Sequence, residues 1–217
     1  MGNIILLLLP SLWETIIMVA ISTIFSLILG FPLGILLVIT EKDGIWERIT
    51  LNSILNGIVN IFRSFPFIIL MIFIMPLTKL IVGKTIGTLA TVVPLSIAAA
   101  PFVARIVESA FKEVDKGIIE AVSSMGASTF EIITKVLIPE AMPSLVLGIT
   151  MTIINLIGYS AMAGAIGGGG LGDLAIRYGY HRYQTDVMIA SVIVIIVLVQ
   201  LIQLLGNKIS YSIDKRK

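Results

Sequence analysis

The sequence predicts an all-α integral membrane protein that forms a single domain over residues 1–217. Hydrophobic residues make up 57% of the chain and charged residues only 13%. A soluble domain carries about 25% charged residues, so this chain has too little charge to cover a water-facing surface. Apolar stretches long enough to cross the roughly 30 Å hydrocarbon core recur along the chain. The five expected transmembrane helices are residues 16–39, 54–78, 85–104, 143–164 and 187–205.

The residue types present exclude several kinds of site. The chain has no cysteine and a single histidine, His181, which rules out a cysteine-based metal centre and most histidine-based ones. We therefore expect neither a metal ion nor a cofactor. A net charge of +2 is too small to indicate a nucleic-acid partner. Glu14 precedes the first long apolar run and no basic segment comes before it, so a cleavable signal peptide is not expected.

The first expected span, residues 16–39, contains no charged residue. Gly30 and Gly34 have the small-xxx-small spacing that lets two helix backbones approach closely. Pro32 lies between them and predicts a kink, because proline removes one helical hydrogen bond. Packing against another helix is the expected role of this glycine pair.

The second span is expected within residues 51–78, and it carries an arginine, Arg63, with Asn60 and Ser64 beside it and Pro66 after it. An arginine deep in a membrane helix costs about 2.5–3.5 kcal/mol on insertion scales. Its side chain must therefore face the bundle interior or a polar pathway, or extend to an interface. The residues alone leave both possibilities open.

The third expected span, residues 85–104, holds Pro94 and Pro101. Two prolines predict a bent helix whose freed carbonyls are satisfied by neighbouring helices. The fourth span, residues 143–164, has Asn155 as its notable polar residue and ends in a glycine-rich stretch. A polar segment with two tyrosines, a pattern typical of a membrane interface, precedes the fifth span.

Basic residues near the helix ends predict the orientation of the chain in the membrane. Five spans place the two termini on opposite sides. One side carries ten basic residues, namely Lys42, Arg48, Arg105, Lys112, Lys116, Lys135, Lys208, Lys215, Arg216 and Lys217. The other side carries four, namely Lys79, Lys84, Arg177 and Arg182. We therefore expect the N-terminus outside and the C-terminus in the cytoplasm.

A polar loop, residues 117–142, lies between the third and fourth spans on the predicted cytoplasmic side. Its first half has apolar residues at helical spacing, Ile118, Ile119, Val122 and Met125. Gly126 is expected to end this helix. The loop is long and polar enough to contact a soluble partner.

The second half of the loop predicts another short helix. Ser128 and Glu131 have the spacing of a capping box, in which each residue satisfies a backbone N–H of the other. Its apolar face is formed by Phe130, Ile133, Val136 and Leu137. Pro139 is expected to stop the helix. This pattern leaves two uses open, an amphipathic helix that rests on lipid or a docking surface for a soluble protein.

The loop resembles the EAA motif of the permeases of ABC importers, in which E-A-A is followed by a glycine and then by I-x-L-P. The spacing matches throughout. The mild departures are Val122, Val136 and Ile138. In that family the loop is a coupling helix that sits in a cleft of the ATPase subunit. The resemblance therefore implies ATPase-coupling roles for Glu120, Ala121, Gly126, Val136 and Pro139.

Residues 60–70, 93–105 and 158–172 resemble the methionine-importer branch of this family. The resemblance covers nearly the whole chain. It implies the type I importer permease fold with five spans and a cytoplasmic coupling helix. It also implies a cell-membrane homodimer that works with two copies of an ABC ATPase and an extracytoplasmic methionine-binding lipoprotein. ATP hydrolysis would then belong to the partner chain, and L- and D-methionine would be the cargo.

The resemblance further implies a translocation pathway through the spans. The residues expected near it are Arg63, Asn155, Tyr159, Ser160 and Met162.

Two alternative functions are open at this point. One is a permease of the same architecture for another amino acid, because the external binding protein usually sets the substrate. The other is an intramembrane serine protease in which Ser160 and His181 form a catalytic pair. The fifth span brings no histidine towards Ser160, and this argues against the protease.

Overall fold

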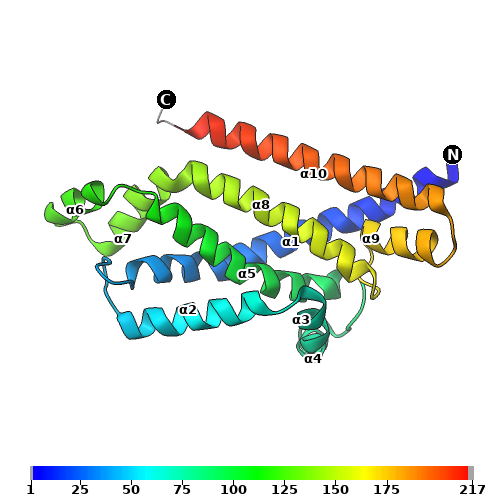
Figure 1. Cartoon of the computed structure of the whole chain (residues 1–217), viewed down its shortest axis with the longest axis horizontal. Helices are drawn as coiled ribbons and strands as arrows, with labels where there is room; N and C mark the ends of the chain where they lie inside the picture. Colours follow the sequence, from blue (N-terminus) through cyan, green and yellow to red (C-terminus); the bar gives the residue numbers. More distant parts are fainter. Residues whose placement is uncertain (1, 215–217) are drawn as a thin grey trace.

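The structure is a computed structural model that describes residues 2–214, and every regular element within these residues is a helix. Four long helices cross the molecule in Figure 1. They are α1 (Gly2–Ile39), α5 (Thr88–Lys112), α8 (Ile138–Gly164) and α10 (Thr185–Ile213). Each is long and apolar enough to cross a membrane, which confirms the predicted class of an all-helical membrane protein.

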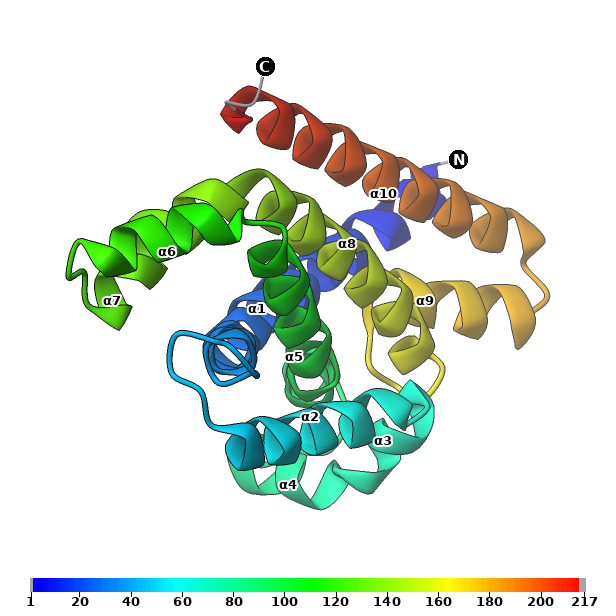
Figure 2. The same cartoon turned by 60° about the vertical axis from the view of Figure 1, so that its left-hand side comes forward.

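Shorter helices complete the chain. Three of them follow α1 in sequence, namely α2 (Ile49–Ser64), α3 (Phe67–Phe73) and α4 (Met75–Val82). The others are α6 (Lys116–Ser124), α7 (Thr129–Ile132) and α9 (Gly170–Leu174), with π-helical segments at Ile133–Leu137 and Ala175–Tyr180. Figure 2 shows α2–α4 on one side, then α1 and α5, then α8, with α10 outermost.

The packing of α1 on α5 is the most extensive helix contact in the described chain. Gly30 and Gly34 lie directly against α5, as their spacing predicts. A Cβ atom on Gly34 would come within 2.6 Å of both the Ala104 carbonyl oxygen and the Val107 Cβ. Gly30 meets the Ala100 carbonyl in the same way. Only glycine allows the two backbones to approach this closely.

The expected second span, residues 54–78, is not one helix. It breaks between α2 and α3, which meet at a bend of 102°. Pro66 is the physical cause, because a proline pushes the preceding residue out of the helical region. Phe65 accordingly adopts an extended conformation with φ −73° and ψ 127°. The bent α2–α3 pair is long and apolar enough to cross a membrane only when the two helices are taken together.

Most helices extend beyond the spans expected from hydropathy, but the expected span 85–104 begins too early, because Gly87 with φ 103° is not helical and α5 starts at Thr88. The apolar runs mark the part of each helix suited to hydrocarbon, whereas the backbone hydrogen bonds continue into the polar flanks. The largest difference is in α1, which begins at Gly2 and therefore includes Glu14. The sequence had placed this residue before the first span.

Glu14 caps a helix that is distant in the sequence. Its carboxylate oxygen accepts a hydrogen bond of 2.7 Å from the Gly170 N–H, at the start of α9. The neighbouring Thr15 hydroxyl accepts one of 2.9 Å from the Leu171 N–H. The glycine-rich stretch turns back on α1 through Gly167, Gly169 and Gly170, whose φ values are 85°, 80° and 79°. An acidic group at a helix N-terminus is favourable because the N–H groups there have no helical partners.

Three of the segments counted on the basic side lie at one end of the molecule. The α1–α2 loop, the α5–α6 loop and the C-terminal end of α10 lie towards the end that holds α6 and α7 (Figure 1). The N-terminus of α1 and α9 lie towards the opposite end. Lys215, Arg216 and Lys217 lie outside the described residues.

We predict that Gly34→Ala lowers the stability of the protein by about 1–3 kcal/mol, the usual range for overpacking. The added methyl group must push α1 away from α5. Thermal unfolding of the detergent-solubilised protein, followed by the loss of monodisperse material, measures the effect. Gly57→Ala is the matched control, because Gly57 also lies inside a helix and a Cβ there meets nothing within 4 Å. Equal stability of the two variants would contradict the close packing of α1 and α5.

We also predict that Glu14→Ala loosens α9. A hydrogen bond to a charged group contributes about 1.5–3 kcal/mol, so amide exchange in residues 168–175 should become about tenfold to hundredfold faster. Hydrogen–deuterium exchange with peptide resolution measures this rate. Glu47→Ala is the control, since its carboxylate contacts only the Asp43 N–H in an exposed loop. Unchanged exchange in α9 would show that the cap is dispensable.

Candidate functional site

The loop between α5 and α8 folds into the two short helices that the sequence predicts. Asp115 caps α6 by accepting a hydrogen bond of 2.7 Å from the Gly117 N–H. Gly126 joins α6 to α7 with φ +84°, a conformation that residues with a side chain rarely adopt. The capping box is present, with the Ser128 hydroxyl accepting from the Glu131 N–H and the Glu131 carboxylate accepting from the Ser128 N–H. Lys135 adds an ion pair of 2.9 Å to Glu131.

The apolar residues of the loop divide between two faces. Ile119, Val122, Ile132 and Leu137 pack inward on a cluster that includes Phe111 of α5. Two other residues of the expected apolar faces point away from this cluster, since Met125 is 85% exposed and Phe130 is 73% exposed. Gly126 turns the chain between them. The helical spacing of each half therefore does not show which face of that helix packs against the rest of the protein.

The outward face also carries most of the residues that the EAA resemblance selects. Glu120, Ala121, Gly126 and Pro139 are exposed, and Val136 is half-buried. Exposed apolar side chains beside a free carboxylate are typical of a surface that contacts another protein. The geometry of the loop thus suits docking.

Pro139 does not stop the helix, contrary to the expectation from its sequence. Residues Thr129–Gly164 run as one helical stretch of 36 residues. Pro139 has no N–H for a helical hydrogen bond, and its ring crowds the carbonyl of the preceding turn. The wider π-helical turn, Ile133–Leu137, ends one residue before Ile138–Pro139 and accommodates the change. The second half of the loop is therefore a continuous helical extension of α8.

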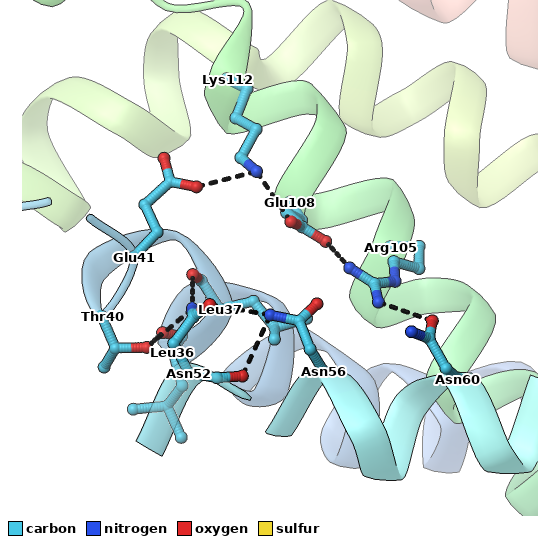
Figure 3. Close-up of polar contacts among 10 residues, drawn as sticks. All are labelled: Leu36, Leu37, Thr40, Glu41, Asn52, Asn56, Asn60, Arg105, Glu108 and Lys112. Carbon is cyan, nitrogen blue, oxygen red and sulfur yellow. Dashed lines mark hydrogen bonds and ion pairs between the residues drawn. The ribbon is translucent and has the colours of Figure 1, made fainter. Parts of the chain in front are cut away.

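A polar network links α1 and α2 near the loop end of the molecule (Figure 3). The Asn52 side-chain amide donates to the Leu37 carbonyl at 2.7 Å and to the Thr40 hydroxyl at 3.1 Å. Asn56 donates in turn to the Asn52 side chain at 2.8 Å. Asn52, Asn56 and Asn60 recur every four residues, so they lie on one face of α2. This spacing is the signal in the sequence that predicts the network.

Charged residues on α5 extend this network. The Arg105 guanidinium donates to the Asn60 side-chain oxygen at 2.8 Å and pairs with Glu108 (Figure 3). Lys112 bridges Glu108 and Glu41, each at 2.8 Å. These contacts hold α1, α2 and α5 together at the loop end and neutralise the charge of Arg105.

The structure brings together two of the five residues expected near a pathway. Arg63, in the last turn of α2, and Tyr159, on α8, line one cavity of about 240 Å³. The Tyr159 ring stacks on Phe67 with a centroid distance of 4.6 Å and an interplanar angle of 7°. The cavity lies at the break between α2 and α3.

The other three expected residues lie elsewhere on α8. The buried Ser160 hydroxyl donates to the Ile157 carbonyl of its own helix at 2.8 Å. Asn155 and Met162 are exposed, in register with Met151 and Gly158 along one stripe of α8. None of the three lines the cavity. The prediction grouped these residues because they lie on one helix. Different faces of that helix, however, meet different surroundings.

The geometry does not support a serine protease site. The Ser160 hydroxyl is committed to its own helix, whereas His181 is exposed and its ring lies against that of Tyr180. Within residues 2–214 these two side chains make no hydrogen bond with each other. A nucleophile and its base need hydrogen-bond reach, so the protease alternative loses its structural basis.

Comparisons with known proteins agree with the importer-like features. Residues 30–217 match the model of a family described as the binding-protein-dependent transport system inner membrane component. The chain is 52% identical over 210 residues to the probable D-methionine transport system permease protein MetI of Vibrio cholerae, covering 97% of this chain and 93% of that protein. It is 51% identical over 181 residues to the methionine import system permease protein MetP of Bacillus subtilis, covering 83% of this chain and 82% of that protein.

A solved structure has the same fold. The chain superposes with a TM-score of 0.97 on a chain from inward facing conformations of the MetNI methionine ABC transporter, at 44% sequence identity. The alignment covers 99% of this chain and 100% of that chain. The similarity therefore extends to the whole arrangement of helices.

Proposed function

The chain belongs to the family of binding-protein-dependent transport system inner membrane components, and on that premise we propose that it forms the pathway by which an ABC importer takes up methionine. It is a multi-pass inner-membrane permease and not itself an enzyme. The observation that carries the methionine assignment is the near full-length similarity to methionine permeases of both Vibrio cholerae and Bacillus subtilis. D-methionine is included because the Vibrio protein is a probable D-methionine permease.

The proposed assembly contains two copies of this chain, two copies of an ABC ATPase and an extracytoplasmic methionine-binding lipoprotein. The similarity to a chain of the MetNI transporter supports the ATPase partner. The exposed stripe of α8 supports a second copy of the permease, because it holds Asn155 on an otherwise apolar surface. A polar side chain facing lipid is costly, and an interface or an aqueous pathway between two subunits would relieve that cost.

The proposed coupling element is the outward face of α6 and α7, with Glu120, Ala121, Gly126, Val136 and Pro139 as its motif residues. Met125 and Phe130 supply exposed apolar surface that a cleft of the ATPase would bury. The unbroken helix from Thr129 to Gly164 supports direct transmission, because movement of α7 must move α8.

The proposed mechanism is alternating access. ATP binding closes the ATPase dimer and draws the two coupling loops together, and the permease subunits then rock about their shared interface. The pathway opens outward to receive methionine from the lipoprotein and inward after hydrolysis. We propose that the N-terminus is outside and that the coupling loop and C-terminus are cytoplasmic. The grouping of the basic loops at the α6–α7 end of the molecule supports this orientation.

Uptake of radiolabelled methionine tests the proposed function. Cells lacking this chain should take up L-methionine at the background rate, and a plasmid copy of the chain should restore the parental rate. An excess of unlabelled D-methionine should compete, whereas unrelated amino acids such as histidine or glutamate should not. The methionine assignment fails if uptake of another amino acid depends on this chain while methionine uptake does not.

A matched pair of glycine variants tests the coupling loop. Gly126→Val should reduce methionine uptake while the protein still inserts in the membrane, because a β-branched residue is strained at φ +84° and changes the angle between α6 and α7. Gly83→Val is the control, since Gly83 has φ +80° and, like Gly126, open space around its Cβ position, but it ends α4. Uptake and membrane content are measured for both. Equal uptake by the two variants would remove the coupling role.

A further inference from the structure

A cavity opens where the second span breaks. Its walls come from α2, α3, α5 and α8, four elements that meet at the 102° bend. Arg63 lies fourteen residues beyond Ile49, the first residue of α2, which corresponds to at most about 21 Å along the helix axis. The hydrocarbon core is roughly 30 Å thick, so Arg63 lies well inside it in the proposed orientation. Irregular backbone at such depth is tolerated where it is buried in protein or lines a cavity.

The cavity combines one cation with aromatic walls. Five aromatic side chains line it together with Arg63, namely Phe62, Phe65, Phe67, Phe102 and Tyr159. Its volume of about 240 Å³ corresponds to about eight water molecules at liquid density. This space suits a free amino acid better than a peptide. Its lining contains no acidic residue.

The polar groups of the cavity have no partner in the described part of the chain. Arg63 makes neither an ion pair nor a hydrogen bond there, and the Tyr159 hydroxyl makes no hydrogen bond. The other arginines of residues 2–214 are engaged. Arg105 pairs with Glu108, Arg177 pairs with Asp173, and Arg48 and Arg182 lie over aromatic rings. Arg63 is exposed in the single chain, and a guanidinium without a partner at membrane depth marks a functional site, because a charge in hydrocarbon is costly.

The side chains that line the cavity indicate which kind of ligand it would bind. A guanidinium binds a carboxylate through two parallel hydrogen bonds, and a carboxylate is the partner that Arg63 lacks in the described chain. The ring faces attract an ammonium group by cation–π interaction, so no acidic side chain is needed for the amino end. Thioether sulfur makes favourable contacts with aromatic rings, which suits the side chain of methionine. A zwitterion with an apolar, polarisable side chain satisfies all three features.

We propose that this cavity is a transit site for methionine inside the permease. Arg63 pairs with the substrate carboxylate, the Tyr159 hydroxyl donates a second hydrogen bond to it, and the phenylalanine rings hold the thioether chain. This inference rests on the proposed function and names the residues that would carry it. Because the walls belong to four elements, any rocking of the helices changes the cavity and with it the affinity for substrate.

A photoreactive methionine analogue, in which a diazirine carbon replaces the thioether sulfur, tests the site. It is added to membrane vesicles that contain the permease with its ATPase, and the labelled peptides are mapped after illumination. Labels are expected within residues 62–70 and around residue 159, and excess unlabelled methionine should prevent them. Arg63→Gln should reduce this labelling about tenfold or more, the loss expected when a charge-assisted hydrogen bond is removed. Arg63→Lys should retain part of it, and Arg48→Gln, the control, should label as the wild type does.

Uptake separates failure of this inference from failure of the proposed function. If wild-type vesicles supplied with the binding lipoprotein do not take up methionine, the proposed function fails. If the wild type takes up methionine and Arg63→Gln matches it in both uptake and labelling, the transit site is wrong and the proposed function stands. If Arg63→Gln does not reach the membrane, the labelling pattern of the wild type is the test. Labels that unlabelled methionine prevents, but that lie only on other helices, would overturn the site. Tyr159→Phe should weaken labelling less than Arg63→Gln does, because the stacked ring remains.

Discussion

The close contact between α1 and α5 supports the rest of the structure. Two glycines one helical turn apart bring the backbones together, and α5 becomes the most buried of the long helices. In a membrane no hydrophobic effect drives helices together, so van der Waals contact at such small residues is a main source of stability. The other helices pack around this pair, with α2–α4 on one side and α8 and α10 on the other (Figure 2). The polar network at the loop end adds directional contacts to the same centre (Figure 3).

Two interruptions in the helices are accommodated in different ways. Backbone groups cannot remain without partners in hydrocarbon, so each break must be covered by protein or must line a cavity. The glycine-rich turn before α9 is covered by Glu14 and Thr15 of α1. The break at Phe65 and Pro66 instead borders the cavity that holds Arg63 and Tyr159. One interruption is closed by polar contacts within the chain, while the other leaves its cation unpaired and thus available to a ligand.

Continuity of the helix beyond Pro139 connects the surface loop with the interior. A proline at this position predicts a helix end, but the π-helical turn before it lets the helix continue. The exposed Phe130 consequently lies on the same continuous helix as Tyr159. A movement imposed on α7 reaches the cavity along one continuous helix. Such a connection suits a permease that is driven by a separate ATPase.

The sequence by itself determined the membrane class, the apolar spans, the glycine contact of the first span, the two-helix shape of the loop and its capping box. These features depend on composition or on residues within a few positions of each other, and local geometry is enough to specify them. Only the tertiary structure decided that Arg63 and Tyr159 share a cavity while Asn155, Ser160 and Met162 face other surroundings. It also decided that Met125 and Phe130 point outward, and that Glu14 caps a helix that starts 156 residues later. Periodicity shows which residues share a helix face, but the neighbours that the fold places against that face determine what those residues do.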